Sequence, residues 1–363
     1  MRGHLAVLGL VLASPAHAQA GDPGYRVGVV SESGDVATWL KPGSAGLSVD
    51  RVVPVGIMPT DIDGPHNITV SPDQRSYFIT VAHGTPFGSL WKMDALGDSL
   101  LGRAQVELFP TTIALTPDGQ FAFVANSDFH GDHPRVNVVS VVYTPTMTTI
   151  THLPACDMPH GVRVNHAGTR VYVSCMMSDE LLEIDRQSLR ILHRQQTGPG
   201  MTTMPAGVGH TAPASGAGDE CSPTFVSVSP DDRRLYVACN HGNSLQVRDA
   251  GTLELIKEIP TGAGAYNVEP SPDGRWVIVT NKKDQSVSLI DAATLAVVAR
   301  IATTKKIPHG VAYSPDGRYA FISVESIGAD PGAVDAIDLV TRTRVATAPV
   351  PRQPTGIAVW VSR

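Results

Sequence analysis

Residues 309–326 read HGVAYSPDGRYAFISVES, and this pattern decides the fold. Apolar and polar residues alternate on both sides of Ser-Pro-Asp-Gly, with the period of a β-strand rather than that of a helix. Proline presets φ and glycine tolerates positive φ, so these four residues predict a tight turn between two antiparallel strands. The stretch therefore predicts a β-hairpin.

The same hairpin recurs along the chain. Its copies begin at His66, Thr112, His160, Thr224, Tyr266 and His309, at intervals of 46, 48, 64, 42 and 43 residues. Each copy is followed by a third strand that ends in aspartate, such as ELLEID or SLQVRD, and then by a fourth. Four strands about every 40–50 residues are typical of a propeller blade.

The two ends of the chain supply one further blade. Residues 354–363 read as a lone first strand with Thr355 at its entry, and residues 25–60 contain three more strands. Joining both ends in one sheet closes the ring and removes exposed sheet edges. The prediction is an all-β, seven-bladed β-propeller of four-stranded antiparallel blades, with residues 25–60 and 354–363 in one sheet.

Short motifs at the strand ends add a resemblance to a known family. FVAN at 123–126, YVAC at 236–239 and VIVTN at 277–281, with the SPDG turns, resemble the YVTN-repeat propellers over essentially the whole mature chain. The wider resemblance takes in seven-bladed lactonases, the methylamine dehydrogenase heavy chain and the propeller of nitrous oxide reductase. It implies the fold but no single function, because propellers serve as binding modules, scaffolds and enzymes.

The N-terminus has the pattern of an export signal. Arg2 precedes an apolar run, and Ala16-His17-Ala18 is typical of a cleavage site, so residues 1–18 are interpreted as a signal peptide. Residues 19–363 are then a single propeller domain, periplasmic or secreted.

Four cysteines in the middle third of the chain agree with an oxidising compartment. Cys175 and Cys239 lie at the same repeat position, and Cys156 and Cys221 lie just before entry positions, which favours the pairs Cys156–Cys175 and Cys221–Cys239. Cross-pairing between the two blades, or a Cys/His metal site, are the alternatives.

Composition excludes some partners. The chain has 363 residues, a net charge of −6 and no basic cluster longer than Lys305-Lys306, so a nucleic-acid partner is not expected. No stretch after the signal is long and apolar enough for a membrane span. The expected partner is a small molecule or a protein at the face of the ring where the first strands begin, which is called the entry face below.

Seven entry residues ring the central channel at that face. They are His66, Thr112, His160, Thr224, Tyr266, His309 and Thr355. The histidines of blades 1, 3 and 6 are nearly evenly spaced, which favours a metal site with an open position, holding Cu, Zn or Fe through His66, His160 and His309. Two alternatives are a metal-free ligand pocket and a structural role. In the structural role, each histidine shares the packed strand face of the apolar residue two positions later, such as Val162.

Loops between second and third strands open on the same face. They add His83, His241, Asn281, Glu325 and Glu32 as ligand-binding candidates. Asp128, His130, Asp132 and His133 in the blade 2 loop are interpreted as a solvated loop rather than a metal site. Residues 194–221, rich in Gly, Pro, Ala and Thr, are interpreted as a lid or docking loop, or as a disordered insertion.

Three functions follow as hypotheses. The favoured one is a periplasmic propeller that binds a metal ion or small molecule at the axial site, with a redox role suggested by the nitrous oxide reductase resemblance. The second is a lactonase-like hydrolase. There, the resemblance implies His309 and Glu325 as the reacting pair, and Arg163 would polarise the carbonyl; the Pro-His-Gly of this chain shifts the histidine by one residue relative to that family. The third is a non-catalytic scaffold or surface interaction module.

Overall fold

The computed structural model describes residues 24–44, 46–57, 62–83, 88–128, 136–198 and 220–362. The first strands of the blades are β4 (Pro65–Val70), β8 (Pro110–Leu115), β12 (Pro159–Val164), β16 (Pro223–Val228), β20 (Ala265–Pro270), β24 (Pro308–Tyr313) and β28 (Pro354–Val361). The second strands are β5 (Ser76–Val81), β9 (Phe121–Asn126), β13 (Arg170–Cys175), β17 (Arg234–Cys239), β21 (Trp276–Asn281), β25 (Tyr319–Val324) and β1 (Tyr25–Ser31). The third strands are β6 (Ser89–Asp94), β10 (Val138–Tyr143), β14 (Glu180–Asp185), β18 (Ser244–Asp249), β22 (Ser286–Asp291), β26 (Gly332–Asp338) and β2 (Val36–Gly43). The fourth strands are β7 (Leu100–Gln105), β11 (Thr148–Pro154), β15 (Ile191–Gln196), β19 (Leu255–Pro260), β23 (Ala296–Ala302), β27 (Thr343–Val350) and β3 (Gly46–Pro54).

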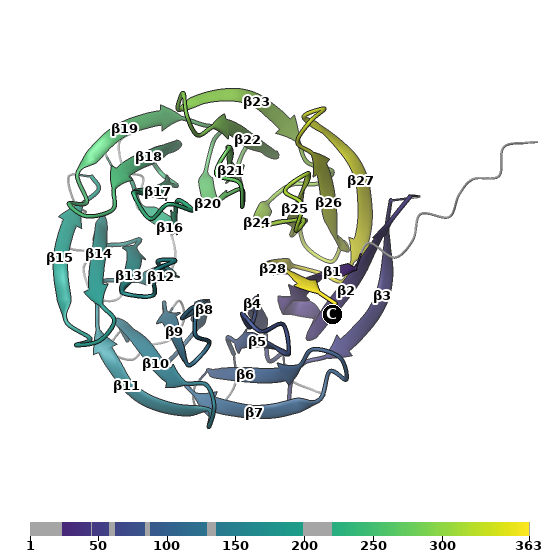
Figure 1. The fold of residues 1–363 in the computed structure, drawn as a ribbon. Coiled ribbons are helices and arrows are strands. Elements are labelled where there is room, and N and C mark those ends of the chain that lie inside the picture. Colours follow the sequence, from purple (N-terminus) through teal and green to yellow (C-terminus); the bar gives the residue numbers. More distant parts are fainter. Residues whose placement is uncertain are drawn as a thin grey trace, which may run out of the picture.

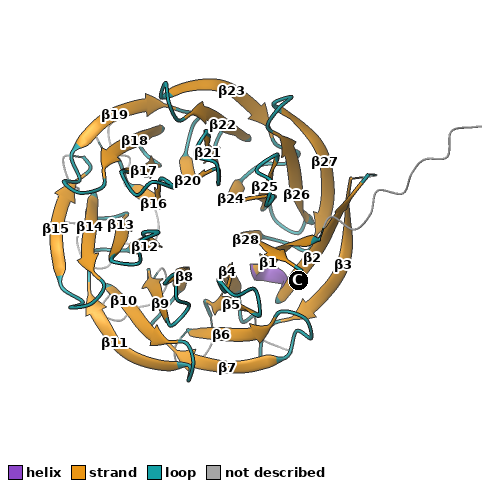
Figure 2. Cartoon of the chain, viewed as in Figure 1, coloured by secondary structure: helices purple, strands orange, loops and turns teal. Residues whose placement is uncertain are grey.

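These strands form seven four-stranded antiparallel sheets around a central channel, with the fourth strands outermost (Figure 1). Blades 1 to 6 follow the chain from β4 to β27, and blade 7 has the order β28-β1-β2-β3. In the described residues the one helix is the 3-10 turn η1 (Glu32–Gly34), between β1 and β2 (Figure 2). The predicted seven-bladed propeller is confirmed.

Ring closure occurs as the sequence predicts. The C-terminal strand β28 pairs antiparallel with β1, from Tyr25 opposite Val361 to Ser31 opposite Pro354. The C-terminus therefore lies beside the first strands of the chain in Figure 1. The pairing with β28 covers the inner edge of β1, so blade 7 has the same four-stranded order as the other blades.

The Ser-Pro-Asp-Gly turns have the predicted geometry. Glycines 119, 274 and 317 have φ of +68°, +70° and +68°, and Gln74 and Asp232 hold the equivalent positive φ in the two turns that lack glycine. The serine hydroxyl binds the aspartate two residues later, as Ser71 Oγ does to Asp73 Oδ1 at 2.6 Å. This local network is why the motif forms a turn in almost every blade.

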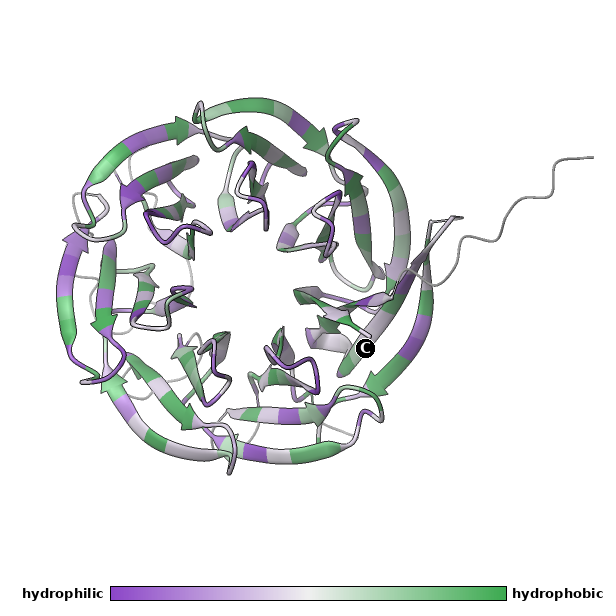
Figure 3. Ribbon diagram, viewed as in Figure 1, coloured by the Kyte–Doolittle hydropathy of each residue, from purple (hydrophilic) through white to green (hydrophobic). Residues whose placement is uncertain are grey.

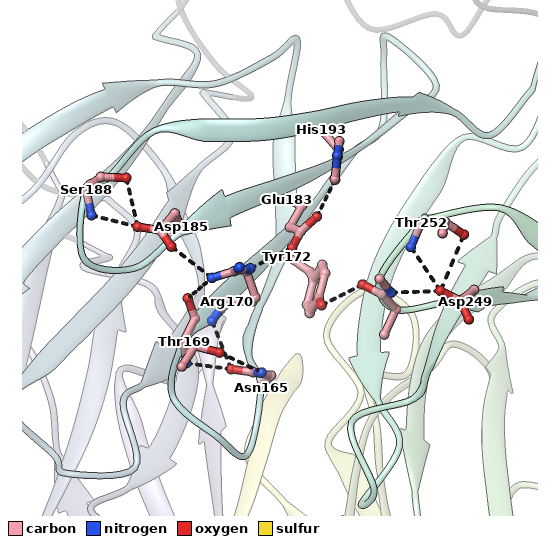
Figure 4. Close-up of polar contacts among 12 residues, drawn as sticks. Asn165, Thr169, Arg170, Tyr172, Glu183, Asp185, Ser188, His193, Asp249 and Thr252 are labelled. Carbon is pink, nitrogen blue, oxygen red and sulfur yellow. Dashed lines mark hydrogen bonds and ion pairs between the residues drawn. The ribbon is translucent and has the colours of Figure 1, made fainter.

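Aspartates at the ends of the third strands organise the turns to the fourth strands. Asp185 Oδ1 accepts hydrogen bonds from the backbone and hydroxyl of Ser188, both at 2.8 Å, and Asp249 binds Thr252 in the same way (Figure 4). The repeated terminal aspartate is therefore a turn-forming residue.

Apolar side chains fill the wedges between adjacent blades. One such cluster contains Phe225, Tyr236 and Val247 of blade 4 together with Val268 and Val277 of blade 5. Along the outer strands, hydrophobic and hydrophilic positions alternate, as Figure 3 shows. Each blade thus buries its faces against its two neighbours.

Both favoured disulfides are present, Cys156–Cys175 and Cys221–Cys239. Each ties the connection before a first strand to the end of the second strand of the same blade. Disulfides of this kind are typical of proteins outside the cytoplasm. No helix in the described part of the chain has the length and apolar character needed to cross a membrane. The predicted signal peptide at 1–18 lies outside the described residues.

Candidate functional site

Every first strand has an irregular register at its entry. In β12, for example, Pro159 pairs with Cys175 but Val162 pairs with Val173, so one extra residue is inserted beside His160. The equivalent shift occurs in the other six inner strands. A β-bulge re-aims the side chain at the inserted residue.

The bulge removes the argument given for the structural alternative, in which each entry histidine shares the packed face of the apolar residue two positions later. Val162 packs with blade 2 residues such as Phe123, whereas the His160 ring contacts Phe225 and Tyr266 of blades 4 and 5. The alternation argument fails because the extra residue changes the parity of the strand. The histidines therefore reach the channel axis.

The three histidines lie around one end of the channel. The centroids of the His66 and His309 rings are 5.6 Å apart, and the Tyr266 ring lies 4.7 Å from His309 and 5.5 Å from His160. All three imidazoles are buried, with residue exposures of 6%, 1% and 2%. Tyr266 thus contacts both His160 and His309, while His66 and His309 meet edge to face.

His66 is oriented by a carboxylate. Its Nδ1 lies 2.8 Å from Glu32 Oε2, while Glu32 Oε1 lies 3.4 Å from Nε2 of the half-buried His83. Burial raises the pKa of Glu32, but His66 and His83 outweigh it and lower the pKa to about 2. Glu32 is therefore ionised and accepts the Nδ1 proton of His66 in a hydrogen bond. This leaves Nε2 of His66, which is buried without a hydrogen-bond partner, as the basic nitrogen of the ring.

His160 has partners on both ring nitrogens. Nδ1 lies 2.8 Å from the carbonyl oxygen of Thr224, and Nε2 lies 3.1 Å from the hydroxyl of Tyr266. Since a carbonyl only accepts, Nδ1 carries the proton and Tyr266 donates to Nε2. Burial lowers the pKa of His160 to about 3 and raises the pKa of Tyr266 to about 12, so both side chains are neutral at pH 7.

His309 lies beside an ion pair. Its Nε2 is 3.8 Å from Glu325 Oε1, which is 2.7 Å from the ammonium of Lys282. Burial lowers the pKa of His309 well below its ordinary value, and the positive charge of Lys282 adds to this effect. Burial also lowers the pKa of Lys282, but Glu325 and Tyr266 outweigh it and leave that pKa raised. The ammonium also sits 3.7 Å from the Tyr266 ring centroid, as a cation–π contact.

Lys282 is a site residue that the sequence analysis missed by one position. The residue after each second strand donates its backbone N–H to the residue just before the first strand of its blade. Glu32, Lys282 and Glu325 do so to Gln353, Gly264 and Ile307. Lys282 therefore occupies the repeat position of Glu32 and Glu325. The predicted residue Asn281 is fully buried in its blade, where its amide donates to Ser286 and Ser288.

The remaining predicted residues are spread more widely. His241 lies on the entry face, 3.7 Å from Glu220, away from the three histidines. Asp128 accepts a hydrogen bond from the backbone of Val136. His130, Asp132, His133 and most of the 194–221 loop lie outside the described residues.

Arg163 lies toward the opposite end of the channel. Arg163 follows His160 by three residues on β12, which is about 10 Å at the rise of a strand. Its guanidinium is 2.9 Å from Glu269 Oε2. The structure therefore separates Arg163 from His309 and Glu325, which the hydrolase hypothesis brings together.

Metal binding by the three histidines stays a prediction. Within the described ranges, no group of three or more His, Cys, Asp or Glu side chains is arranged to hold a metal ion. The site nevertheless offers buried nitrogens without hydrogen-bond partners, at His66 Nε2 and on both sides of the His309 ring.

The family model of the cytochrome D1 heme domain matches residues 222–309, about a quarter of the chain. This match runs from the start of blade 4 to His309 and includes Tyr266 and Lys282. No curated protein matches the sequence.

Three solved structures share the propeller. Kuenenia stuttgartiensis hydrazine synthase is 22% identical with a TM-score of 0.66, covering 85% of this chain and 94% of that chain. A functionally unknown protein from Desulfotomaculum acetoxidans is 14% identical with a TM-score of 0.72, covering 92% and 98%. Dihydro-heme d1 dehydrogenase NirN in complex with DHE is 17% identical with a TM-score of 0.59, covering 97% and 78%. At these identities the likeness establishes the fold, and the YVTN-repeat assignment stays a resemblance.

Proposed function

We propose that this protein is a heme-binding propeller of the periplasm, with a heme of the d1 type held at the entry end of the channel and used in redox chemistry. Support comes from the family match over residues 222–309 and from a neighbour described as a dihydro-heme d1 dehydrogenase. The two disulfides support a site of action outside the cytoplasm.

The observation that carries the proposal is the state of His66. Imidazoles that bind a metal commonly donate their other N–H to a carboxylate, which fixes the ring and raises its basicity. His66 makes this contact with Glu32 at 2.8 Å, and its Nε2 is buried without a partner. His66 would therefore hold the iron of a bound heme through Nε2, with Glu32 fixing the orientation of its ring.

The neighbouring side chains fit the same cofactor. The ring centroid of His309 lies 5.6 Å from that of His66, neither of its buried nitrogens is within hydrogen-bond geometry of a partner, and burial keeps it neutral. The Tyr266 ring lies 4.7 Å from the His309 ring, and the Lys282 ammonium sits over the Tyr266 ring. When bound, heme iron supplies reversible one-electron chemistry. Of the chain's own groups, Glu32 orients the imidazole of His66, and Lys282 keeps an ammonium charge close to the site.

The test is a spectroscopic titration of the purified mature chain with hemin and with isolated heme d1. We expect saturation at one equivalent and the low-spin spectrum of an imidazole-ligated iron. His66→Ala should abolish this spectrum, and added imidazole should restore it. Glu32→Gln should shift the absorption bands of the low-spin spectrum but retain heme binding, because a neutral acceptor makes the His66 imidazole less basic.

His193→Ala is the matched control. His193 Nδ1 also contacts a carboxylate, Glu183 Oε2 at 2.6 Å, but on the outermost strand β15 (Figure 4). Its removal should leave the titration unchanged. Failure of the parent chain to bind either heme, or an unaltered spectrum in His66→Ala, would overturn the proposal and favour the scaffold hypothesis.

A further inference from the structure

A cavity opens at the end of the channel opposite the histidines. It has a volume of about 780 Å³, and the turn prolines Pro72, Pro117, Pro230 and Pro272 lie at its mouth. Its inner end reaches Phe225, whose ring also contacts His160 and Tyr266. Phe225 therefore stands between this cavity and the site described above. The volume lies in the range of small-molecule sites.

The cavity has a polar wall and an apolar wall. Blades 3 to 5 supply Arg163, Ser227, Asn267 and Glu269. Blades 2, 6 and 7 supply the apolar side, which contains Ile113, Leu115, Ala312, Ile357 and Ala358. A ligand that fits both walls has a charged or polar head and an aliphatic body.

The polar wall contains one positive and one negative group in contact. Arg163 Nη2 donates to Glu269 Oε2 at 2.9 Å, and Ser227 Oγ donates to the same oxygen at 3.3 Å. Both contacts use Oε2, which leaves Oε1 for a ligand. About a quarter of each charged side chain is exposed, 24% for Arg163 and 27% for Glu269. The pair thus presents adjacent positive and negative charges to the cavity.

Asn267 adds an unsatisfied acceptor. The residue is only 6% exposed and lines the cavity, and its Oδ1 is buried without a hydrogen-bond partner. A buried carbonyl oxygen without a donor is costly, and a ligand N–H removes that cost. Asn267 lies two residues before Glu269 on β20, and both residues line the cavity.

We infer that this cavity binds a free α-amino acid with an aliphatic side chain. The carboxylate pairs with Arg163, the ammonium donates to Glu269 and Asn267, and the side chain lies on the apolar wall. Because Arg163 and Glu269 are in contact, the two ligand charges must be adjacent, as they are in an amino acid. The termini of a peptide are farther apart, and a sugar provides no charge for either group.

The test is calorimetric titration of the full mature chain with L-leucine. We expect saturable binding at one equivalent. 4-Methylpentanoate, which lacks the ammonium, and 3-methylbutylamine, which lacks the carboxylate, should each bind at least about tenfold more weakly, because each loses a charge-assisted hydrogen bond. Leucyl-leucine and glucose are the competing ligand classes, and tighter binding of either would overturn the assignment.

Substitutions locate the site. Arg163→Met and Glu269→Gln should each weaken L-leucine binding at least about tenfold. The matched control is Arg186→Met, because Arg186 contacts Asp118 at the same distance, 2.9 Å, outside the cavity. The control should bind L-leucine like the parent.

Asn267→Leu keeps the test decisive if the charged variants fold poorly. It removes the unsatisfied oxygen, so the chain should fold at least as stably as the parent while binding L-leucine more weakly. Absence of L-leucine binding to the parent, or unchanged binding in Glu269→Gln and Asn267→Leu, would overturn the inference. The heme titration is independent of this result, because Phe225 separates the two sites.

Discussion

Acidification from pH 7 to pH 5 should destabilise the fold through the buried axial histidines. His160 has a pKa of about 3 in the folded chain, against its ordinary value of 6.5. The unfolded chain therefore takes up a proton over this range while the folded chain does not. The contribution of His160 to the free energy of unfolding is fully present above about pH 6.5 and is lost as the pH falls toward 3.

The size of the effect follows from the two pKa values. Between pH 7 and pH 5, proton uptake by the unfolded imidazole lowers the free energy of unfolding by about 2 kcal/mol for His160 alone. His309 acts in the same direction, because burial also lowers its pKa. Glu32 adds little in this window, since its ordinary pKa of 4.5 and its folded pKa of about 2 both lie below pH 5.

The assay is urea unfolding of the cofactor-free chain at pH 7, 6 and 5, followed by tryptophan fluorescence. His160→Gln removes the titrating group but keeps a donor for Thr224 and an acceptor for Tyr266. It should reduce the pH dependence by about 2 kcal/mol, whatever it does to stability at pH 7. Equal pH dependence in the parent and His160→Gln would refute the reasoning.

Two further outcomes test how the ring is built. Gly310→Ala should lower the free energy of unfolding by about 1–3 kcal/mol, because the added Cβ would lie 2.8 Å from the Thr355 carbonyl oxygen of the next blade. Gly251→Ala, whose Cβ would meet nothing closer than 3.4 Å, is the control for urea unfolding, and an equal loss in both would contradict the packing argument. Deleting residues 356–363 removes most of β28 and should abolish cooperative thermal unfolding in calorimetry. A truncated chain that melts like the parent would show that ring closure is dispensable.

The blades were predictable because their signals are local. Strand alternation, the Ser-Pro-Asp-Gly turn and the terminal aspartate act over a few residues, so each repeat can be read without its neighbours. Ring closure followed from matching two incomplete blades, and the disulfides followed from aligning Cys175 with Cys239.

The site was predictable only in part. The repeat position of His66, His160 and His309 placed them at one rim, and Glu32 and His83 lie beside His66 as expected for that face. The bulge was missed because it depends on pairing between strands and leaves no mark in the alternation. The contact between Tyr266 and His160 joins residues 106 positions apart, and no local pattern reports it.

The pairing of β28 with β1 has a consequence for how the chain is made. β1 and β28 lie about 320 residues apart in the sequence, so blade 7 stays incomplete until the chain has reached β28. Its three N-terminal strands must wait, with the inner edge of β1 unpaired, for about 300 residues of intervening chain. Contacts of such large sequence separation form slowly. Closure of the ring therefore comes after the six other blades have been made, and a chaperone that shields the β1 edge would act at the stage where the protein is most exposed to aggregation.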